Sequence, residues 1–553
     1  MLKLINVKLA YSAGGRTYTV TTAESRENRR AALDVILGED RFCARVRVLS
    51  PDRPIVMERL SAEFEYEPEK DSRVFLNGYQ SWTDSIEHDP FDKMRGIDHI
   101  PRPVLEKYAF SQYGDYSFAG YSHRRGVLHG FGYGYIKHRN GEFEFIGSLN
   151  ENEAFTIIRT DAEKKRITVS KDCKGVRFCS GFGGIDLCFL RGSENYVFDE
   201  YFRRIGVRPL PAGQLFGYTS WYRHYQDISQ SKLEKDLAGL VNSEHKADVF
   251  QIDDGYQTAV GDWLSIDKEK FPEGLGPIAE SIREKGLVAG LWLAPFVCEK
   301  KSFIYRSKPQ WLLKDKNGEP VRGGSNWSGF YALDIYNEEF RAYLREVFDT
   351  VVKEWGFRLL KLDFLYAACL IPREDKTRAM VMADGMDLLR ELCGEARILG
   401  CGVPMTSAFG KVEYCRIGCD ISLDWDDKPY MRLMHRERTS TKNCILNSVF
   451  RRQLNGRAFI NDPDVFLLRD TDNTMTDDEK LCLAEVNSLA GGVLFTSDNF
   501  DEYDEDKRQI LDNMLSRRSC AGGIVSADLE GSTLRVVYNG DGAQVTRIYR
   551  ACF

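Results

Sequence analysis

The chain has 553 residues, of which 43% are hydrophobic and 29% are charged, and its formal net charge is -7. This length is too great for one hydrophobic core and predicts two or three domains. Acidic and basic residues are well mixed, so a nucleic-acid-binding face is not expected. No apolar run approaches the roughly 18 residues that a membrane span requires.

The fourteen cysteines are scattered, without a CxxC pair or a repeated spacing. Reduced thiols are the simpler interpretation, and they favour a cytoplasmic protein. The first segment, MLKLINVKLAYSAGG, mixes charge with alternation and lacks a long apolar stretch. It predicts neither a signal peptide nor a membrane anchor.

Residues 1–205 consist of short runs in which apolar and polar residues alternate, such as TYTVTTAE, CARVRVLS and RITVSKDC. Turn residues separate these runs about every eight to twelve positions, a pattern typical of an all-β sandwich. We therefore predict an N-terminal β-sandwich domain over residues 1–205. The segment that follows, GVRPLPAG at residues 206–213, has the composition of a linker.

Residues 215–515 show a different pattern, in which strand-like apolar runs alternate with amphipathic helical stretches. This order predicts βαβ units and a parallel sheet. Eight units over about 300 residues fit a (β/α)8 TIM barrel, which we assign to residues 206–515, and a doubly wound open sheet is the alternative. Alternation then returns, so residues 516–553 are predicted to form a small C-terminal antiparallel β domain. The eight runs end at Trp221, Tyr256, Phe296, Tyr366, Met405, Ser422, Val465 and Phe500.

In a barrel of this kind the active site gathers at the carboxyl ends of the strands. A single aspartate there is often only the cap of the following helix, but here several strand ends carry one. The expected mouth is therefore rich in carboxylates, with a lysine, an arginine and aromatic rings. Its candidate residues are Asp253, Asp254, Trp292, Lys361, Asp363, Cys401, Arg416, Asp420, Asn461, Asp462, Asp464 and Asp498.

Clustered aspartates serve two classes of chemistry. Metal hydrolases on this fold usually add histidine ligands, and only His224 lies near a predicted strand end, so no metal or cofactor is predicted. An all-oxygen magnesium site remains an alternative. Glycoside hydrolysis instead needs one carboxylate on each face of the anomeric centre. Predicted strands four and six, two places apart on a closed barrel, could supply the two carboxylates.

A series of motifs appears in order on successive predicted strands. They are NGYQSW (77–82), GYTSW (217–221), DDGYQ (253–257), GDW (261–263), GLWLAPF (290–296), KLDFLYA (361–367), LGCGVP (399–404), RIGCD (416–420) and NDPD (461–464). With these motifs the chain resembles the α-galactosidases of glycoside hydrolase family 36, in their short bacterial form. The resemblance covers nearly the whole length.

The resemblance implies a role for each matching residue. Asp363, in the K-x-D-F motif, corresponds to the family's nucleophile, and Asp420, which ends the R-I-G-x-D motif, to its acid/base. The other positions are implied to bind or border the sugar. Sugar hydroxyls would be contacted by Asp253, Asp254, Lys361 and Arg416. The sugar ring would lie beside Trp292 and Cys401, and Trp82 would reach over the mouth of the barrel. The remaining candidates are Trp221 and Trp425.

One segment departs from the family pattern. The acid/base motif of this subgroup often continues Thr-Ala-Pro-Phe-Trp, whereas here residues 421–425 read Ile-Ser-Leu-Asp-Trp. Because this segment is expected close to the sugar, we expect an altered substrate choice, towards an N-acetylated or otherwise modified galactose.

The predicted function is that of a retaining, exo-acting hydrolase that releases terminal α-linked galactose through a covalent glycosyl-aspartate. We expect Lys361 to lower the pKa of Asp363 and the surroundings of Asp420 to raise its pKa. The predicted partner is an α-galactoside oligosaccharide or glycoconjugate, and assembly into a homo-oligomer is left open. Alternatives are an α-N-acetylgalactosaminidase, an α-galactosyl transglycosylase, a catalytically silent carbohydrate-binding protein and a metal-dependent hydrolase.

Overall fold

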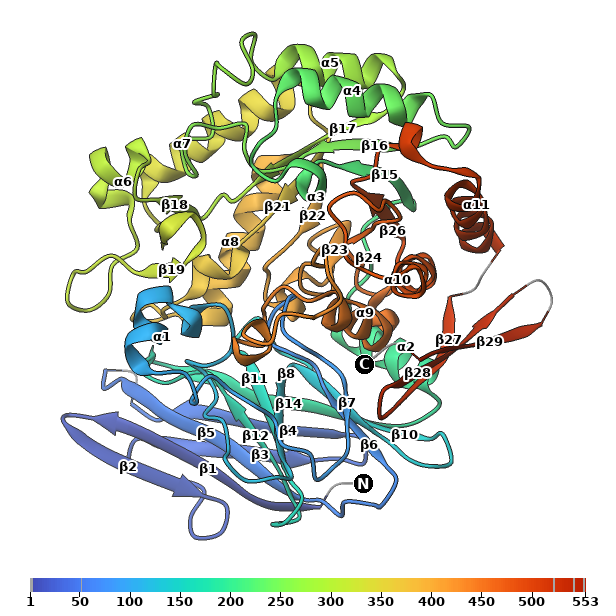
Figure 1. Cartoon of the computed structure of the whole chain (residues 1–553). Helices are drawn as coiled ribbons and strands as arrows, with labels where there is room; N and C mark the ends of the chain where they lie inside the picture. The colour runs from blue at the N-terminus through green and yellow to red at the C-terminus, as the bar shows by residue number, and fades with distance from the viewer. Residues whose placement is uncertain (1–2, 51, 521–522, 541–542, 551–552) are drawn as a thin grey trace.

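The computed structural model describes residues 3–50, 52–520, 523–540, 543–550 and 553. Two antiparallel sheets from the first part of the chain lie at one end of the molecule, and a curled parallel sheet with surrounding helices lies at the other (Figure 1). A three-stranded sheet from the C-terminal part lies against one side.

The first two sheets form a sandwich whose facing residues make one hydrophobic cluster, including Leu9, Phe42, Leu60 and Val169. Alternating burial along β1 and β4 explains this packing, because every second side chain enters the cluster. One sheet contains β1 (Leu4–Ala13), β2 (Arg16–Thr21), β5 (Ile55–Glu65), β8 (Val127–Phe131), β11 (Thr156–Asp161), β12 (Arg166–Lys171) and β13 (Arg177–Phe178). The other contains β3 (Ala31–Leu37), β4 (Arg41–Val48), β6 (Arg73–Leu76), β7 (Glu87–His88), β9 (Tyr133–Lys137), β10 (Phe143–Ser148) and β14 (Gly181–Gly192).

Two helices interrupt the N-terminal region that alternation assigned wholly to strands. They are α1 (Arg102–Tyr108) and α2 (Glu194–Ile205). Ser193 caps the start of α2, and Gly206 ends it in the left-handed conformation with φ 68°. Its buried face joins aromatic side chains of the second sheet, so that Phe198 contacts the rings of Tyr133 and Phe145.

The parallel sheet has nine strands in the order β24-β23-β22-β21-β17-β16-β15-β26-β25. Its two edge strands follow one another in the chain and are separated only by Pro463 and Asp464, so the sheet curls back on itself rather than staying open. Its strands are β15 (Leu215–Thr219), β16 (Val249–Ile252), β17 (Val288–Leu293), β21 (Leu359–Leu362), β22 (Arg397–Gly400), β23 (Tyr414–Arg416), β24 (Ile460–Asp462), β25 (Val465–Phe466) and β26 (Val493–Thr496).

Helices surround this curled sheet (Figure 1). They are α3 (Trp221–His224), α4 (Gln230–Val241), α5 (Gly276–Glu284), α6 (Phe303–Ser307), α7 (Glu338–Asp349), α8 (Arg378–Cys393), α9 (Thr441–Phe450), α10 (Asp477–Ala490) and α11 (Glu505–Cys520). A small antiparallel sheet, made of β18 (Val297–Glu299), β19 (Arg322–Gly324) and β20 (Phe330–Ala332), follows β17.

Every strand of the curled sheet is shorter than the run that predicted it. The run that ends at Tyr366, for example, contains β21 only as far as Leu362. The remaining residues turn away from the sheet, which leaves Asp363 as the first residue after the strand. The predicted runs therefore contain both the strands and the loops that carry the polar side chains.

The C-terminal sheet consists of β27 (Ile524–Glu530), β28 (Thr533–Asn539) and β29 (Gln544–Tyr549), paired antiparallel. The predicted boundary after residue 515 falls inside α11, which continues to Cys520. One hydrophobic cluster runs from the second N-terminal sheet through the curled sheet to Leu534 and Val536 of β28. In the described part of the chain, no helix combines the length and the apolar character needed to cross a membrane.

Candidate active site

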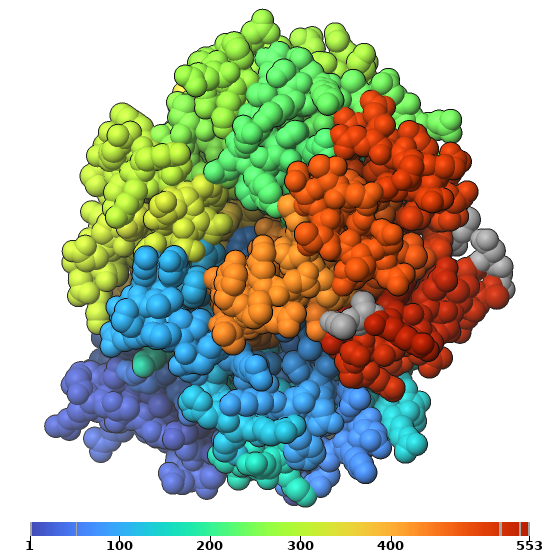
Figure 2. All heavy atoms as spheres, in the orientation of Figure 1, coloured from blue at the N-terminus to red at the C-terminus, as the bar shows by residue number. Residues whose placement is uncertain are grey.

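A cavity of about 200 Å³ lies at the carboxyl ends of the parallel strands, and we call it the site cavity. Figure 2 shows the molecular surface hollowed where segments from the blue, green, yellow-green and orange parts of the chain meet. Eight of the predicted site residues line this cavity, namely Trp82, Trp221, Asp253, Asp254, Trp292, Lys361, Asp363 and Asp420.

Asp363 lies at the bottom of a tight turn directly after β21. Its backbone N–H donates to the Leu293 carbonyl at 2.8 Å, which anchors the turn to the end of β17. Its carboxylate accepts from Trp292 Nε1 at 3.1 Å and from the Phe364 N–H at 2.8 Å. Phe364 has φ 53°, a left-handed conformation that is costly for an aromatic residue and is often found at functional sites.

Burial raises the pKa of Asp363, and it outweighs the opposing effect of the Lys361 ammonium. The predicted effect of Lys361 on the pKa of Asp363 is confirmed in direction, but burial is the larger effect. Lys361 Nζ donates to Asp253 Oδ2 at 2.9 Å, so its hydrogen-bond partner is a carboxylate that follows β16. Asp420 raises the pKa of Asp363 further by repulsion between like charges.

Asp253 is held by neutral donors and by the lysine. Gln251 Nε2 donates to its Oδ2 at 3.0 Å, and its own backbone N–H donates to Ser220 Oγ at 2.9 Å. Its other oxygen accepts from the Asp254 N–H at 2.9 Å. These hydrogen bonds hold the carboxylate in the wall of the site cavity.

Asp254 accepts three side-chain hydrogen bonds, which come from Gln226, Gln257 and Trp327. Burial nevertheless raises the pKa of Asp254, while the three donors act in the opposite direction. Both members of the Asp-Asp pair thus reach the cavity, because the chain turns immediately after β16.

Trp327 was missed by the sequence analysis. Its indole N–H donates to Asp254 Oδ2 at 2.9 Å, and its ring contacts those of Trp292 and Phe364. Trp327 and Ser328 both have positive φ, at 53° and 63°, in the loop between β19 and β20. The sequence RGGSNWSGF signals an irregular loop, but nothing in it indicates that the loop folds back over the strand ends.

Arg416 joins two carboxylates behind the cavity wall. Its Nη2 lies 2.8 Å from Asp420 Oδ1 and 3.1 Å from Asp464 Oδ2. Asp464 also accepts from the Tyr222 hydroxyl and from the Ile421 N–H. Burial raises the pKa of Asp464, whereas Arg416 lowers it. This network fixes the start of the loop that carries Asp420.

Asp363 and Asp420 differ in their exposure to solvent. The Asp420 side chain is 40% exposed, whereas Asp363 as a residue is 7% exposed. The acidic neighbours of Asp420 are engaged elsewhere: Asp424 pairs with Lys428, and Asp426 accepts from Arg438. One carboxylate is therefore enclosed and the other lies open to solvent.

Trp82 reaches the cavity from the N-terminal region. Its indole N–H donates to Cys401 Sγ at 3.3 Å, and its ring contacts Phe364 and Tyr366. Gly402 lets the ring approach, because a Cβ there would lie 2.9 Å from Trp82 Cζ2 and 3.0 Å from the Phe364 nitrogen. Cys401 itself lies behind Trp82 rather than in the wall of the site cavity.

Arg451 holds the segment that carries Trp82. This side chain is 1% exposed, and it donates to Asn77 Oδ1 and to the carbonyls of Gly78, Gln80 and Ser81. It also donates to the Ile417 carbonyl, which lies in the loop after β23. Burial lowers the pKa of Arg451 to about 10.

The structure does not bring Trp425 to the site cavity. Its ring is 3% exposed and lies 5.2 Å from the ring of Phe553, edge to face. The prediction assumed that the whole segment after Asp420 lies beside the sugar. Instead, at Trp425 the loop has turned away from the site cavity and packs against the C-terminal part of the chain. Arg416 likewise lies behind the wall and acts through Asp420 and Asp464.

Further lining residues were not predicted. They come from four places whose position depends on tertiary contacts: residues 110–113, the loop around Trp327, the turn at Phe364, and residues 431–439. The additional residues are Phe110, Tyr113, Ser325, Asn326, Trp327, Phe364, Met431, Met434, His435, Glu437, Arg438 and Thr439.

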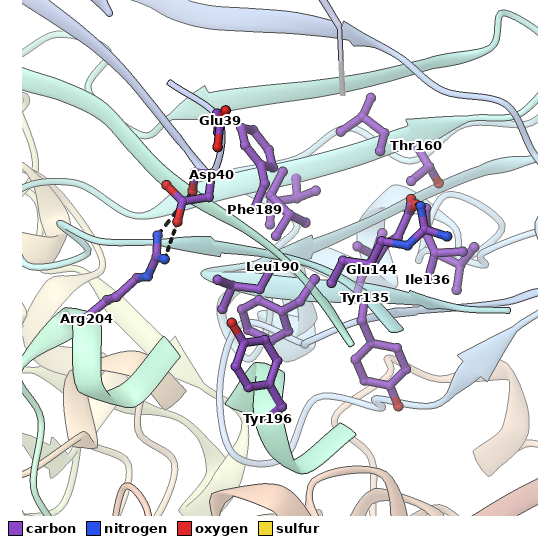
Figure 3. Close-up of a pocket in the computed structure, with 17 residues that line it drawn as sticks. Glu39, Asp40, Tyr135, Ile136, Glu144, Thr160, Phe189, Leu190, Tyr196 and Arg204 are labelled. Carbon is purple, nitrogen blue, oxygen red and sulfur yellow. Dashed lines mark hydrogen bonds and ion pairs between the residues drawn. The ribbon is translucent and has the colours of Figure 1, made fainter. Parts of the chain in front are cut away.

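A second cavity, of about 310 Å³, lies in the N-terminal sandwich (Figure 3). Its lining is mainly apolar, with side chains such as Leu190, Phe189 and Ile136, and the Asp40–Arg204 ion pair lies at one end. It lacks the buried carboxylates of the site cavity, so it offers no comparable acid/base chemistry.

The central part of the chain matches the family model "Melibiase" over residues 218–380. A stretch of 141 residues is 31% identical to an "A type blood alpha-D-galactosamine galactosaminidase" from Flavonifractor plautii. A stretch of 155 residues is 29% identical to "Alpha-galactosidase Mel36A" from Lactobacillus acidophilus. These alignments cover 24% and 26% of this chain, but only 13% and 19% of the two relatives.

Solved structures match over nearly the whole chain. TtGalA, an α-galactosidase from Thermus thermophilus solved with p-nitrophenyl α-D-galactopyranoside, has a TM-score of 0.71 and 26% identity, and the match covers 93% of this chain and 98% of that one. The family 36 α-galactosidase AgaA from Geobacillus stearothermophilus has a TM-score of 0.60 and 14% identity, covering 94% of this chain and 71% of that one. The second likeness concerns the fold alone.

Proposed function

The chain belongs with the α-galactosidases of glycoside hydrolase family 36, and from this premise we propose that it is a retaining, exo-acting hydrolase that releases terminal α-linked galactose. We take the curled sheet as a (β/α)8 barrel, and residues 1–205, 206–515 and 516–553 as the three domains. The observation that carries the proposal is the pair Asp363 and Asp420, one enclosed and one open, in the wall of a single cavity.

In the proposed reaction Asp363 attacks the anomeric carbon while the bond to the leaving oxygen breaks. The departing oxygen takes the bonding electrons and receives a proton from Asp420. Water then enters from the open side, Asp420 removes its proton, and the resulting oxygen displaces Asp363. Two inversions restore the α configuration. The exposure of Asp420 supports its role, because this group must exchange protons with water.

The enclosed end of the cavity fits the recognition of one sugar ring. Its volume of about 200 Å³ is below the roughly 300–1,000 Å³ of pockets for drug-sized ligands. Asp253, Asp254 and Lys361 present fixed, buried polar groups to the ring hydroxyls. A sugar whose hydroxyls do not meet these groups would leave them unpaired, which supports selection of galactose over its epimers.

Asp363→Asn tests the nucleophile. Turnover of p-nitrophenyl α-galactoside should fall by at least about 10⁴-fold, on the scale of other removed nucleophiles, while the circular dichroism spectrum stays unchanged. Proton NMR of the wild-type reaction should show the α anomer of galactose first. Wild-type rates in the mutant, or a β anomer as first product, would contradict the proposal.

Asp420→Ala tests the acid/base. Substrates with poor leaving groups should lose more rate than aryl galactosides, because only the former depend on protonation. Azide should restore turnover and form α-galactosyl azide, since it displaces Asp363 from the β-linked glycosyl-aspartate with inversion and needs no base catalysis. Asp427→Ala removes a neighbouring acidic side chain and serves as control. Equal losses for all leaving groups would contradict the assignment.

A second candidate substrate is a 2-amino or 2-acetamido galactoside. The replacement of the usual Thr-Ala-Pro-Phe-Trp by residues 421–425 favours it, and one relative is named for such a sugar. Rates on p-nitrophenyl α-galactoside and on its 2-acetamido and 2-amino analogues, measured side by side, decide between these substrates.

A further inference from the structure

A second hollow, of about 650 Å³, adjoins the site cavity. Met434, His435 and Arg438 line both spaces, so they form the boundary where one continues into the other. The rest of its wall comes from residues 84–99, 121–123 and 432–438. We call this space the basic hollow.

The lining of the basic hollow carries an excess of positive charge. The lining contains five lysine and arginine side chains but only two carboxylates, Asp84 and Asp98. It also contains four histidines, which are His435 and the set His88, His99 and His123. The five cations are Lys93, Arg95, Arg432, Arg436 and Arg438. The chain as a whole has a net charge of -7, so the excess is a local property of this wall.

Part of this charge is already neutralised. Arg438 donates to Asp426, Arg432 lies 3.5 Å from the same carboxylate, and Arg436 lies 3.7 Å from Asp115. Lys93 and Arg95 are exposed, and no carboxylate among the described residues forms an ion pair with either. These two cations are therefore available to a ligand.

The boundary itself holds two buried nitrogens without a hydrogen-bond partner among the described residues, His435 Nδ1 and Arg438 Nε. The His435 ring is held parallel to that of Tyr113, at 4.8 Å and 3°, and Arg438 is fixed by Asp426. His435 Nδ1 lies 3.6 Å from Glu437 Oε2. The ring stack and the ion pair therefore hold both side chains in place where the site cavity continues into the basic hollow.

Building on the proposed function, we propose that the basic hollow binds the leaving part of the substrate and that this part is anionic. The natural substrate is then an α-galactoside whose aglycone carries a carboxylate, sulfate or phosphate group. The galactose ring occupies the site cavity, the first aglycone unit passes His435 and Arg438, and the anionic group meets Lys93 and Arg95.

The test compares substrates that differ only in charge. Oxidation of melibiose gives melibionate, and reduction gives melibiitol, so the pair carries a carboxylate or a CH2OH at the same carbon. The same two reactions on manninotriose, which has one more galactose, give a longer pair. We expect kcat/KM for at least one aldonate to exceed that of its alditol about fivefold at low salt, as one or two exposed ion pairs would give, and the preference to shrink as salt screens it.

The double variant Lys93→Ala/Arg95→Ala should remove this preference and leave kcat/KM for the alditols unchanged. The matched control Lys8→Ala/Arg16→Ala removes the same two charges from the exposed hairpin β1–β2, far along the sandwich, and should keep the preference. Hydrolysis of both alditols without any preference for either aldonate would overturn the inference alone. Failure to hydrolyse any of the four sugars or p-nitrophenyl α-galactoside would instead overturn the proposed function.

Discussion

Burial of Asp363 couples the proposed reaction to pH. Its pKa is raised by burial, so the protonated, unreactive form persists to higher pH than for an exposed aspartate. Activity should therefore fall as the pH decreases through this raised pKa, and the acid limb of kcat/KM should lie above the usual range of aspartate. The limb reports the free protein, since kcat/KM reflects its ionisation.

Trp292→Phe should move that acid limb to higher pH. The indole N–H at 3.1 Å from Asp363 Oδ2 stabilises the ionised carboxylate, and its removal leaves burial less opposed. We also expect kcat/KM at neutral pH to fall by about tenfold, the cost of one charged hydrogen bond. The pH profile with p-nitrophenyl α-galactoside measures both effects.

Trp311→Phe is the control for this variant, because its indole donates to Glu339, which does not line the site cavity. An acid limb in Trp292→Phe that stays in place or moves to lower pH would contradict the argument.

At the residue scale, sequence reasoning located the groups that lie near the ends of strands or directly after them. Asp253, Lys361 and Asp363 lie next to well-marked apolar runs, and the direction of a parallel strand determines the edge at which they appear. Trp327 and His435 come from irregular loops, whose course is set by contacts such as the Asp254–Trp327 hydrogen bond and the Tyr113–His435 stack. No local pattern encodes such contacts.

The loop after β22 links strand geometry to the site. Gly402 has φ 53°, and a side chain there would press on Trp82 and on the nitrogen of Phe364, which donates to Asp363. Gly402→Ala should therefore lower kcat/KM of p-nitrophenyl α-galactoside by about 100-fold, since a displacement of about an ångström at reacting groups has that effect. It should also lower the free energy of unfolding by about 1 kcal/mol.

Gly394→Ala is the matched control, because that glycine has φ 54° but no atom lies within 4 Å of the point that an added Cβ would occupy. It should share the loss of stability and keep its activity. Equal activity losses in both variants would assign the effect to backbone strain alone.

At the scale of elements, period-two alternation identified the strands of the N-terminal sandwich, and helical periodicity identified helices around the curled sheet. Alternation failed at α2, which lies at the end of the region assigned to strands, although its buried residues Val197, Phe198, Tyr201 and Phe202 recur at helical spacing. The single strand expected up to Val465 is divided into β24 and β25, because Pro463 cannot donate a ladder hydrogen bond and Asp464 has φ 73°. The assigned domain limits stay a prediction, and α11 crosses one of them.

At the scale of the whole molecule, Arg451 joins the N-terminal sandwich to the curled sheet. Arg451→Met should lower the free energy of unfolding by about 3–5 kcal/mol. Five buried acceptor oxygens would lose the guanidinium that donates to them. Urea denaturation followed by tryptophan fluorescence measures the loss. Arg203→Met, in an exposed ion pair with Glu200, should cost no more than about 1 kcal/mol.

An Arg451→Met protein as stable as the Arg203→Met protein would mean that the two parts are held together by apolar contacts alone. The continuous hydrophobic cluster between them makes a single cooperative transition the expected form of unfolding in both proteins.

The guanidinium of Arg451 also has a consequence for protein engineering. The wall formed by Trp82 is supplied by a distant stretch of polypeptide and clamped in place by a residue of the helical half. A minimised catalyst cut from residues 206–515 would therefore open on one side and expose Cys401 to water. Such a fragment would keep the Arg451 guanidinium, but it would need the NGYQSW segment added back to occupy that guanidinium and rebuild the missing wall.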